Sequence, residues 1–305
     1  MESLLTSSTF SPNLIFSGLN GDIIDYIISS YMVNMNLIKI YYWHPNLIIH
    51  CNNAYNDTLD DQKYIVYHNL INNGIYHAKF VLITTSKMLR LIIMSTNITN
   101  QLIQNCWNDY YILNIPFTST PSFTNNTDLL NLFFSTYNIN LKMSLSNYDW
   151  SNVHAILSVS IPNITSHTNC WNHLFPTQPH GSCIVQTPTA MLNYNLLDTL
   201  GLDNSTFNCP FDLDSRKNSD MSYFLINNLD KNTLYKLNYI HSSLPYHFKR
   251  YFIHTLNPLA DWFILTSANL TYYAWGSKYS PSRNAELGVI WKFSDVQKKS
   301  KEQKV

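Results

Sequence analysis

Short apolar runs separated by polar turns dominate the N-terminal half of the chain. Residues 36–50 contain two such runs, broken by Pro45, and residues 64–68, 75–83 and 88–95 contain one each. Runs of this length, bounded by turn residues, are typical of buried strands. Residues 127–138 are longer and predict a helix, with Thr127 as the candidate N-cap.

A second unit is predicted to begin near residues 148–150. VHAILSVSIP (153–162) favours a strand, and SCIVQTPTAML (182–192) favours a strand, a turn and a helix. Residues 203–220 are rich in Pro, Asn and Asp and predict a loop. We therefore expect an α/β protein of mixed α+β layers, with an N-terminal half at 1–145 and a C-terminal half at 146–305.

The two halves share a repeated motif. Residues 75–100 and 245–272 each contain an aromatic residue, His-x-Lys, and an apolar run that closes on Ser-(Thr/Ala)-Asn. Such a repeat indicates a duplicated unit whose two copies face one another across a pseudo-twofold axis. The histidines are expected on strands and the asparagines at strand-to-loop corners. The repeated residues are His77, Lys79 and Asn97 in one copy and His247, Lys249 and Asn269 in the other.

The repeated residue types suit a phosphodiester. On a strand, residues i and i+2 project from the same face, so each imidazole and ammonium would enter one pocket. Ammonium and carboxamide groups donate to phosphate oxygens. One histidine can attack phosphorus while the other protonates the leaving oxygen. We therefore expect no cofactor and no metal, because the lysines would neutralise the phosphate.

Composition adds bounds on partners and compartment. The chain has 305 residues with 19 basic and 19 acidic side chains, so nucleic acid would have to be bound by local groups. Five cysteines, an odd number, indicate a reducing compartment. Cys170, His173 and His180 could be drawn as metal ligands, but a buried cysteine near unrelated histidines is the favoured interpretation. We expect no zinc, no membrane span and a monomer.

The paired half-sites resemble the phospholipase D superfamily, and more closely its tyrosyl-DNA phosphodiesterase branch. Most of the superfamily carries an aspartate five residues after the lysine, where this chain has Thr84 and His254. The tyrosyl-DNA phosphodiesterases also lack that aspartate. SANLTYYAWG (267–276) and RNAELGVIW (283–291) are similar to two further segments of that branch. The resemblance runs from about residue 13 to residue 294 and implies a pseudo-twofold phospholipase D-like fold, each half a mixed sheet flanked by helices.

The resemblance also implies roles. His77 would be the nucleophile and His247 the general acid and base, while Lys79, Lys249, Asn97 and Asn269 would hold the phosphate. Glu286 would support a catalytic histidine, with an ordinary strand-end salt bridge as the alternative. Ser267 and Ser95–Thr96 are candidate phosphate donors. The family has a Gln that supports the nucleophilic histidine; Asn108 is nearest to that place, with Gln104 close by.

The implied function is hydrolysis of DNA 3′-phosphotyrosyl bonds left by topoisomerase I, and of other 3′-blocking groups, as a nuclease-like step of DNA damage repair. Single-stranded DNA is the expected partner. Two alternatives stay open: a lipid phosphodiesterase or general nuclease of the same superfamily, and a non-catalytic module that binds DNA ends. The basic tail at 298–304 fits either a nuclear signal or a solvated end.

Overall fold

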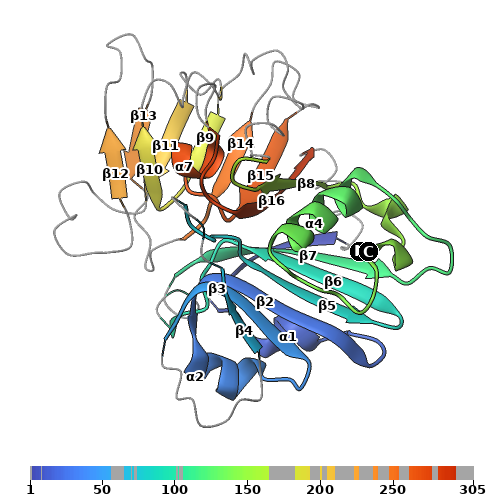
Figure 1. The fold of residues 1–305 in the computed structure, drawn as a ribbon. Coiled ribbons are helices and arrows are strands. Elements are labelled where there is room, and N and C mark those ends of the chain that lie inside the picture. The colour runs from blue at the N-terminus through green and yellow to red at the C-terminus, as the bar shows by residue number, and fades with distance from the viewer. Residues whose placement is uncertain are drawn as a thin grey trace, which may run out of the picture.

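Two seven-stranded sheets form the body of the protein in the computed structural model (Figure 1). The structure describes residues 2–7, 9–55, 65–69, 71, 74–100, 102, 106–164, 183–192, 200, 205–209, 223–226, 236–239, 247–253, 261–276 and 281–292. The basic tail, Gln104, His254 and the trio of Cys170, His173 and His180 lie outside these residues. Within them, no helix is long and apolar enough to cross a membrane.

The first sheet has the strand order β1-β7-β6-β5-β2-β3-β4. Its central strand β2 pairs in parallel with β3, and β3 pairs in parallel with β4; β5, β6, β7 and β1 then add antiparallel on the other side. The bounds are β1 Glu2–Ser7, β2 Ile23–Asn34, β3 Leu47–Tyr55, β4 Ile65–His68, β5 Phe80–Thr85, β6 Met88–Met94 and β7 Asn108–Pro116.

The second sheet repeats this arrangement. Its order, β8-β16-β15-β14-β9-β11-β13, matches the first sheet strand for strand, with the same parallel and antiparallel pairings. A small parallel pair, β10 Thr189–Leu192 with β12 Tyr223–Ile226, lies beside it. The bounds are β8 Ile156–Ser160, β9 Cys183–Gln186, β11 Ser205–Cys209, β13 Lys236–Tyr239, β14 Arg250–Ile253, β15 Trp262–Thr266 and β16 Glu286–Lys292.

The matching orders confirm the duplicated, mixed α/β fold that the repeated motif predicts. β5 and β6 of the first sheet correspond to β14 and β15 of the second, so each copy of the motif leads into the same strand. The boundary at 145/146 stays a prediction, although β1–β7 all pair in the first sheet and β8 begins the second.

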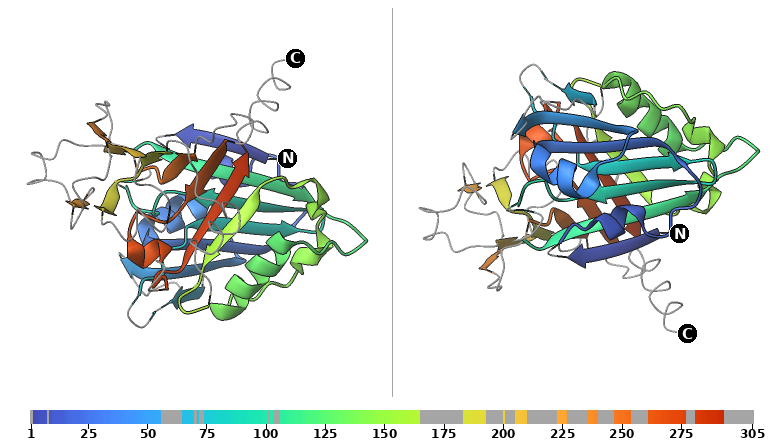
Figure 2. Two further views of the ribbon diagram at one scale, coloured as in Figure 1. Left: turned by 90° about the horizontal axis from the view of Figure 1, so that it is seen from above. Right: turned by 90° about the horizontal axis from the view of Figure 1, so that it is seen from below.

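The two sheets face one another across a shared core. Alternate residues of β5, β6 and β7 on one side, and of β8, β15 and β16 on the other, bury their side chains together with the helix α4 Asn125–Thr136. From above, β16 crosses over the strands of the first sheet, with α4 beside it (Figure 2). The opposite face of the first sheet is covered by α1 Pro12–Phe16, α2 Met35–Leu37 and the π-helix η1 Ile38–Tyr42. The motif strands β5 and β6 are therefore buried on both faces.

Several local predictions are confirmed and others are wrong. Strands are found at 65–68 and 88–94, and the predicted helix runs from Asn125 to Thr136. Its N-cap is Thr124, whereas Thr127 completes a capping box three residues later. The first apolar run of 36–50 is helical rather than extended, and residues 189–192 form a strand instead of a helix. Part of the predicted loop at 203–220 is strand β11.

Candidate active site

The His-x-Lys motifs lie in the extended segments that lead into β5 and β14, just before the strands begin. The His77 backbone N–H donates to the carbonyl of Ala285, 2.9 Å away, and the His247 N–H donates to that of Trp107, 2.7 Å away. Ala285 belongs to the C-terminal half and Trp107 to the N-terminal half. Each histidine is thus held by the other half, and the predicted placement on the strands themselves is off by a few residues.

The asparagines follow β6 and β15, at the strand-to-loop corners where they were expected. Asn97 is buried, and Asn269 is half-buried with its Oδ1 3.5 Å from the Thr187 hydroxyl. The Ile98 N–H donates to Ser30 Oγ, which fixes the corner at Asn97 against the end of β2. Each corner follows a strand whose last residue donates its N–H to the carbonyl of a motif lysine, Met94 to Lys79 and Thr266 to Lys249.

His77 is oriented by the carboxylate of Glu286. The His77 Nδ1 lies 3.0 Å from both carboxylate oxygens, and Glu286 is fully buried at the start of β16. The Ser267 hydroxyl and the Asn284 amide donate to the same carboxylate. Because a carboxylate only accepts, Nδ1 must carry a proton, and the Nε2 lone pair is free to attack. This arrangement gives Glu286 a partner at the site, the supporting role that the resemblance implied.

His247 has a neutral acceptor instead. Its Nδ1 lies 2.8 Å from the carbonyl oxygen of Ser95, which also accepts from Lys249 Nζ at 2.8 Å. Lys249 Nζ lies within 3.4 Å of both ring nitrogens. A carbonyl acceptor again places the proton on Nδ1, so Nε2 is the ring nitrogen that can accept from Lys249. The two imidazoles therefore have the same tautomer but partners of different charge.

That difference separates the two histidines electrostatically. Burial lowers the pKa of His77 to about 4, although the Glu286 carboxylate opposes the shift. Burial also lowers the pKa of His247 well below its usual value, and the charges of Lys249 and Lys79 lower it further. His77 is stabilised as the more basic nucleophile, and protonated His247 would be the stronger acid.

Both lysines are fully buried, which favours an anionic ligand. Lys79 Nζ donates to the His77 carbonyl at 2.7 Å. Burial lowers the pKa of Lys79 to about 7, with Glu286 opposing the shift, and lowers that of Lys249 well below its usual value. Among the described residues, Glu286 is the one carboxylate whose charge acts on His77 and on the two lysines. A phosphodiester would supply the negative charge that the lysines lack.

Asn108 has partners other than the nucleophile. Asn108 begins β7, and Glu286 begins β16. The next residue in each strand donates its N–H to a serine hydroxyl: Asp109 to Ser95, and Leu287 to Ser267. Asn108 Nδ2 donates to the carbonyls of Leu102 and Cys106. His77 is thus paired with Glu286. Asn108 follows Trp107, the residue whose carbonyl accepts from the His247 N–H, and its side chain bonds to its own loop rather than to His77.

The candidate phosphate donors also have other partners. The Ser267 hydroxyl donates to Glu286 at 2.5 Å. The Ser95 hydroxyl accepts from the Asp109 N–H, and Thr96 donates to the Asn97 carbonyl. These hydroxyls stabilise the strand ends on which the catalytic side chains depend.

Position 84 shows what replaces the superfamily aspartate. The Thr84 hydroxyl donates to Asp25 in the neighbouring strand at 2.6 Å. The buried Asp25 carboxylate also accepts the backbone N–H groups of Lys142 and Met143. A carboxylate from β2 therefore ties the end of β5 to the segment that leads into the second half.

The two C-terminal segments have clear structural reasons. In the Ala-Trp-Gly segment, α7 Tyr272–Trp275 ends at Gly276, whose φ of +79° favours glycine. Trp275 is buried. In the Glu-Leu-Gly-Val segment, a Cβ on Gly288 would lie 2.8 Å from Thr266 Cβ. Glycine at 288 lets β15 pack closely against the strand that carries Glu286.

Tyr31 is a site residue that the sequence analysis missed. Its ring centroid lies 5.4 Å from that of His77, and Lys79 Nζ lies 6.0 Å from it. It is partly exposed near the end of β2. The apolar run YIISSYMV hides it, because nothing in the local pattern distinguishes a site aromatic from a core aromatic.

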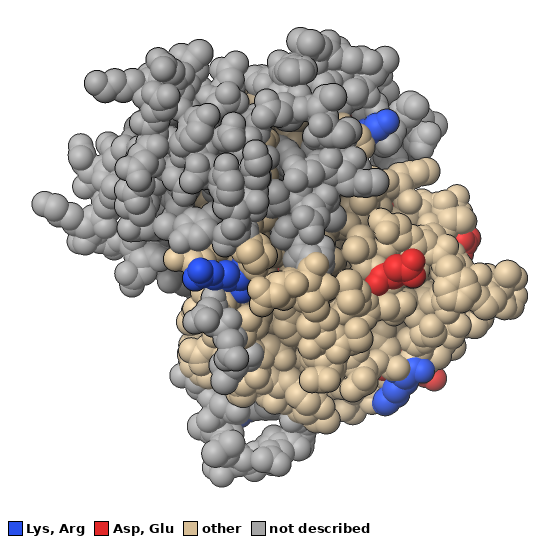
Figure 3. All heavy atoms as spheres, turned by 45° about the horizontal axis from the view of Figure 1, so that its top comes forward, with Lys and Arg blue, Asp and Glu red and all other residues tan. Residues whose placement is uncertain are grey.

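The visible surface carries few charges. On the face drawn in Figure 3, the described lysines, arginines, aspartates and glutamates lie apart and form no basic patch. Among the described residues, no three His, Cys, Asp or Glu side chains gather to hold a metal ion. The lysines of the site, Lys79 and Lys249, are buried.

Comparisons with known proteins agree with this geometry. Residues 210–305, which contain His247, Lys249, Asn269 and Glu286, match the family model of tyrosyl-DNA phosphodiesterase. No curated protein sequence matched the chain. A crystal structure of a mutant yeast tyrosyl-DNA phosphodiesterase is similar at a TM-score of 0.75 and 13% identity, over 96% of this chain and 88% of that one.

More distant solved structures share the fold. Polyphosphate kinase from Porphyromonas gingivalis is similar at a TM-score of 0.58 and 8% identity, over 99% of this chain and 49% of that one. Phosphatidylserine synthase from Haemophilus influenzae is similar at a TM-score of 0.50 and 11% identity, over 99% of this chain and 85% of that one. At these identities the likenesses show a phospholipase D-like fold alone.

The family match and the fold meet at the same residues. The matched segment supplies one His, Lys and Asn set together with Glu286, and the duplicated fold supplies the second set from the other half. Residues 210–305 thus match the tyrosyl-DNA phosphodiesterase family model, and the chain as a whole has a phospholipase D-like fold.

Proposed function

We propose that this protein hydrolyses DNA 3′-phosphotyrosyl bonds, such as those of topoisomerase I peptide adducts, and other 3′-blocking groups, through a covalent phosphohistidine. The observation that carries the proposal is the pairing of two imidazoles, one on a carboxylate and one on a carbonyl, beside two buried lysines. The family-model match of residues 210–305 supports phosphodiesterase activity, and the activity, the substrate and the mechanism together form the proposal.

The first step uses the free Nε2 of each histidine. His77 Nε2 attacks phosphorus, and the P–N bond forms as the bond to the tyrosine oxygen breaks. The negative phosphodiester raises the pKa of His247, which then carries a proton on Nε2 and gives it to the leaving oxygen. Lys79, Lys249 and the two asparagines hold the phosphate oxygens while charge develops on them.

The second step returns the site to its starting state. Neutral His247 takes a proton from water, whose oxygen attacks phosphorus from the side that the tyrosine has left. The P–N bond to His77 breaks, and the DNA keeps a 3′-phosphate. Glu286 stabilises the positive charge on the His77 ring while the intermediate exists, so both histidines end as they began.

The proposed setting is repair of DNA ends in the nucleus by a monomer. Its support is the family's printed substrate name together with a site that needs no broad basic surface, because the buried lysines provide the positive charge. Single-stranded DNA suits such a site better than a duplex, since backbone amides, hydroxyls and aromatic rings can hold a single strand with little net charge.

The test is cleavage of a 3′-phosphotyrosyl oligonucleotide in the presence of EDTA. We expect tyrosine and a 3′-phosphate oligonucleotide as products at an unchanged rate. Hydrolysis of phosphatidylcholine vesicles without cleavage of the oligonucleotide would instead make the protein a lipid phosphodiesterase. Loss of cleavage with EDTA, restored by a divalent cation, would refute the metal-independent mechanism.

Trapping distinguishes an enzyme from a DNA-end binding module. His247→Asn should accumulate a covalent DNA adduct that is absent from the double variant His77→Ala/His247→Asn. His154→Asn is the matched control, because His154 is an exposed histidine outside the site. If no variant forms an adduct and His77→Ala binds DNA as the wild type does, the protein is a binding module.

A further inference from the structure

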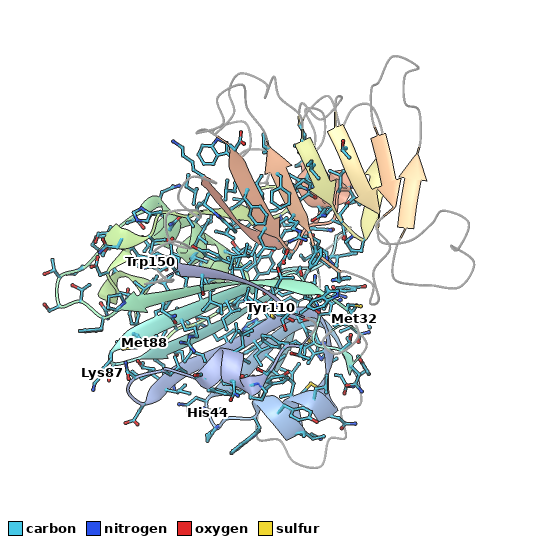
Figure 4. The ribbon with its side chains drawn as sticks, turned by 180° about the vertical axis from the view of Figure 1, so that it is seen from behind. Met32, His44, Lys87, Met88, Tyr110 and Trp150 are labelled. Carbon is cyan, nitrogen blue, oxygen red and sulfur yellow. The ribbon has the colours of Figure 1, made fainter. Side chains whose placement is uncertain are left out.

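The aromatic ring of Tyr31 stands at the mouth of the site, beside the nucleophile. Its centroid lies 5.4 Å from that of His77, with the two ring planes inclined at 54°. The ring is partly exposed, whereas Ser30 before it and Val33 after it are buried. Met32, its neighbour in the chain, lies where the first sheet meets the C-terminal half (Figure 4). The Tyr31 ring thus lies against His77 while part of its surface is exposed.

The duplicated fold has no second ring in this place. Strand pairing shows which residues of the two halves correspond. Phe80 and Arg250 each follow a motif lysine, and their partners in the neighbouring strands are Ser29 and Gln186. Two residues further along, Tyr31 in the first half therefore corresponds to Pro188 in the second. The two halves therefore differ at this position: the first has an aromatic ring beside His77, and the second has a buried proline.

In-line displacement decides which part of the substrate meets each wall. The leaving oxygen must lie opposite the attacking His77 Nε2, so the departing group occupies the His247 side. Groups that flank His77 belong to the part that stays attached to phosphorus. For a DNA 3′ end, that part is the terminal nucleoside, which carries a flat base.

We propose that Tyr31 is a specificity-determining residue that stacks on the base of the retained 3′-terminal nucleoside. This inference rests on the proposed function. Every base has a π face, so stacking gives preference for a nucleoside without preference among bases. A partly exposed ring next to the nucleophile also positions the 3′ oxygen relative to His77 Nε2, because the sugar connects the base to the phosphate.

The test compares two oligonucleotides that end in a 3′-(p-nitrophenyl) phosphate. One has thymine at its last residue, and the other has a tetrahydrofuran abasic residue there. We expect the wild type to favour the base in kcat/KM by roughly tenfold, since stacking is worth about 1–3 kcal/mol per base. Tyr31→Ala should lose that preference, and Tyr31→Phe should keep it. Tyr41→Ala is the matched control, because Tyr41 is an exposed tyrosine of the same half.

A binding measurement separates this inference from the proposed function. Fluorescence anisotropy with the corresponding 3′-phosphate oligonucleotides requires no turnover. Suppose that the wild type cleaves neither substrate but binds the base-bearing oligonucleotide more tightly, and that Tyr31→Ala loses this preference. The hydrolytic function then fails, and stacking stands. If Tyr31→Ala keeps the preference, or weakens base and abasic substrates equally, stacking is refuted. Loss of the preference in Tyr31→Phe would also refute it, since the hydroxyl would then be responsible.

Discussion

Replacing Lys79 with methionine should stabilise the fold while it removes activity. Methionine has a similar length and no charge, so Lys79→Met keeps the side chain buried and avoids placing an ammonium away from water. Lys79 Nζ makes one hydrogen bond, to the His77 carbonyl, which the variant loses. We expect the gain from removing the buried charge to exceed the loss of that bond.

The magnitude follows from the pKa of Lys79. It lies at about 7 in the folded protein, against 10.5 for an ordinary lysine. Below pH 7 the folded protein bears the full penalty, and the penalty falls as pH rises toward 10.5, because the unfolded chain then binds more protons than the folded one. The free energy of unfolding should therefore be reduced by roughly 4 kcal/mol at pH 7 and by about 2 kcal/mol at pH 9.

Urea unfolding at pH 7 and pH 9 measures both values. The free energy of unfolding of the wild type should increase from pH 7 to pH 9. In Lys79→Met that increase should be smaller by about 2 kcal/mol. His77 titrates near pH 4 and does not contribute in this window. Lys87→Met, a change at an exposed lysine, is the control. A Lys79→Met protein that is less stable than the wild type at pH 7, or that keeps the full pH dependence, would refute the reasoning.

Three other outcomes are expected. The value of kcat/KM should fall with rising pH once His247 of the free enzyme has lost its proton, because that proton must be restored for His247 to act as the acid. It should fall more steeply above about pH 7, as Lys79 also loses its proton, and it should fall below about pH 4, as His77 gains one; a stopped-assay pH profile shows these limbs. Glu286→Gln should lower kcat/KM by at least about tenfold without unfolding the protein, because His77 loses the negative partner that makes it basic; equal activity would contradict the proposed orientation. Gly288→Ala should destabilise the fold by about 1–3 kcal/mol in urea unfolding, since the added methyl meets Thr266 Cβ. Gly18→Ala is the comparison: that site has no close side-chain contact, so the variant tests backbone strain alone.

Local pattern predicted the elements whose environment is uniform along their length. β6 is buried at every position, and its continuous apolar run predicted a strand correctly. The run at 36–42 was misassigned because a short apolar segment fits a strand or a helix equally well. There Leu37, Ile38 and Tyr42 are buried while Ile40 and Tyr41 are exposed, a spacing that suits one helical face. The pattern of apolar residues over so short a segment could not distinguish a strand from a helix.

The site was predictable where function depends on spacing within one segment. His-x-Lys recurs with the same spacing, and Asn follows the lysine by 18 residues in one copy and 20 in the other. The structure brings the histidines and lysines of both copies within electrostatic reach of one another. Partners that cross between halves were harder to assign. Which histidine meets Glu286 depends on how the two sheets face one another, and Asn108 was matched to His77 because chain distance alone was considered. Tyr31 carries no motif at all.

Symmetry and its breaking together explain how this site could divide labour. Duplication alone yields two equivalent imidazoles, and either of them could then attack phosphorus while the other gives the proton. The first residues of β16 and β7 occupy matching positions, yet one is Glu286 and the other is Asn108. The carboxylate reaches across to His77, while the amide turns to the carbonyls of its own loop and leaves His247 to a neutral backbone acceptor. One substitution between two equivalent strand ends therefore sets the charge difference that makes His77 basic and His247 acidic.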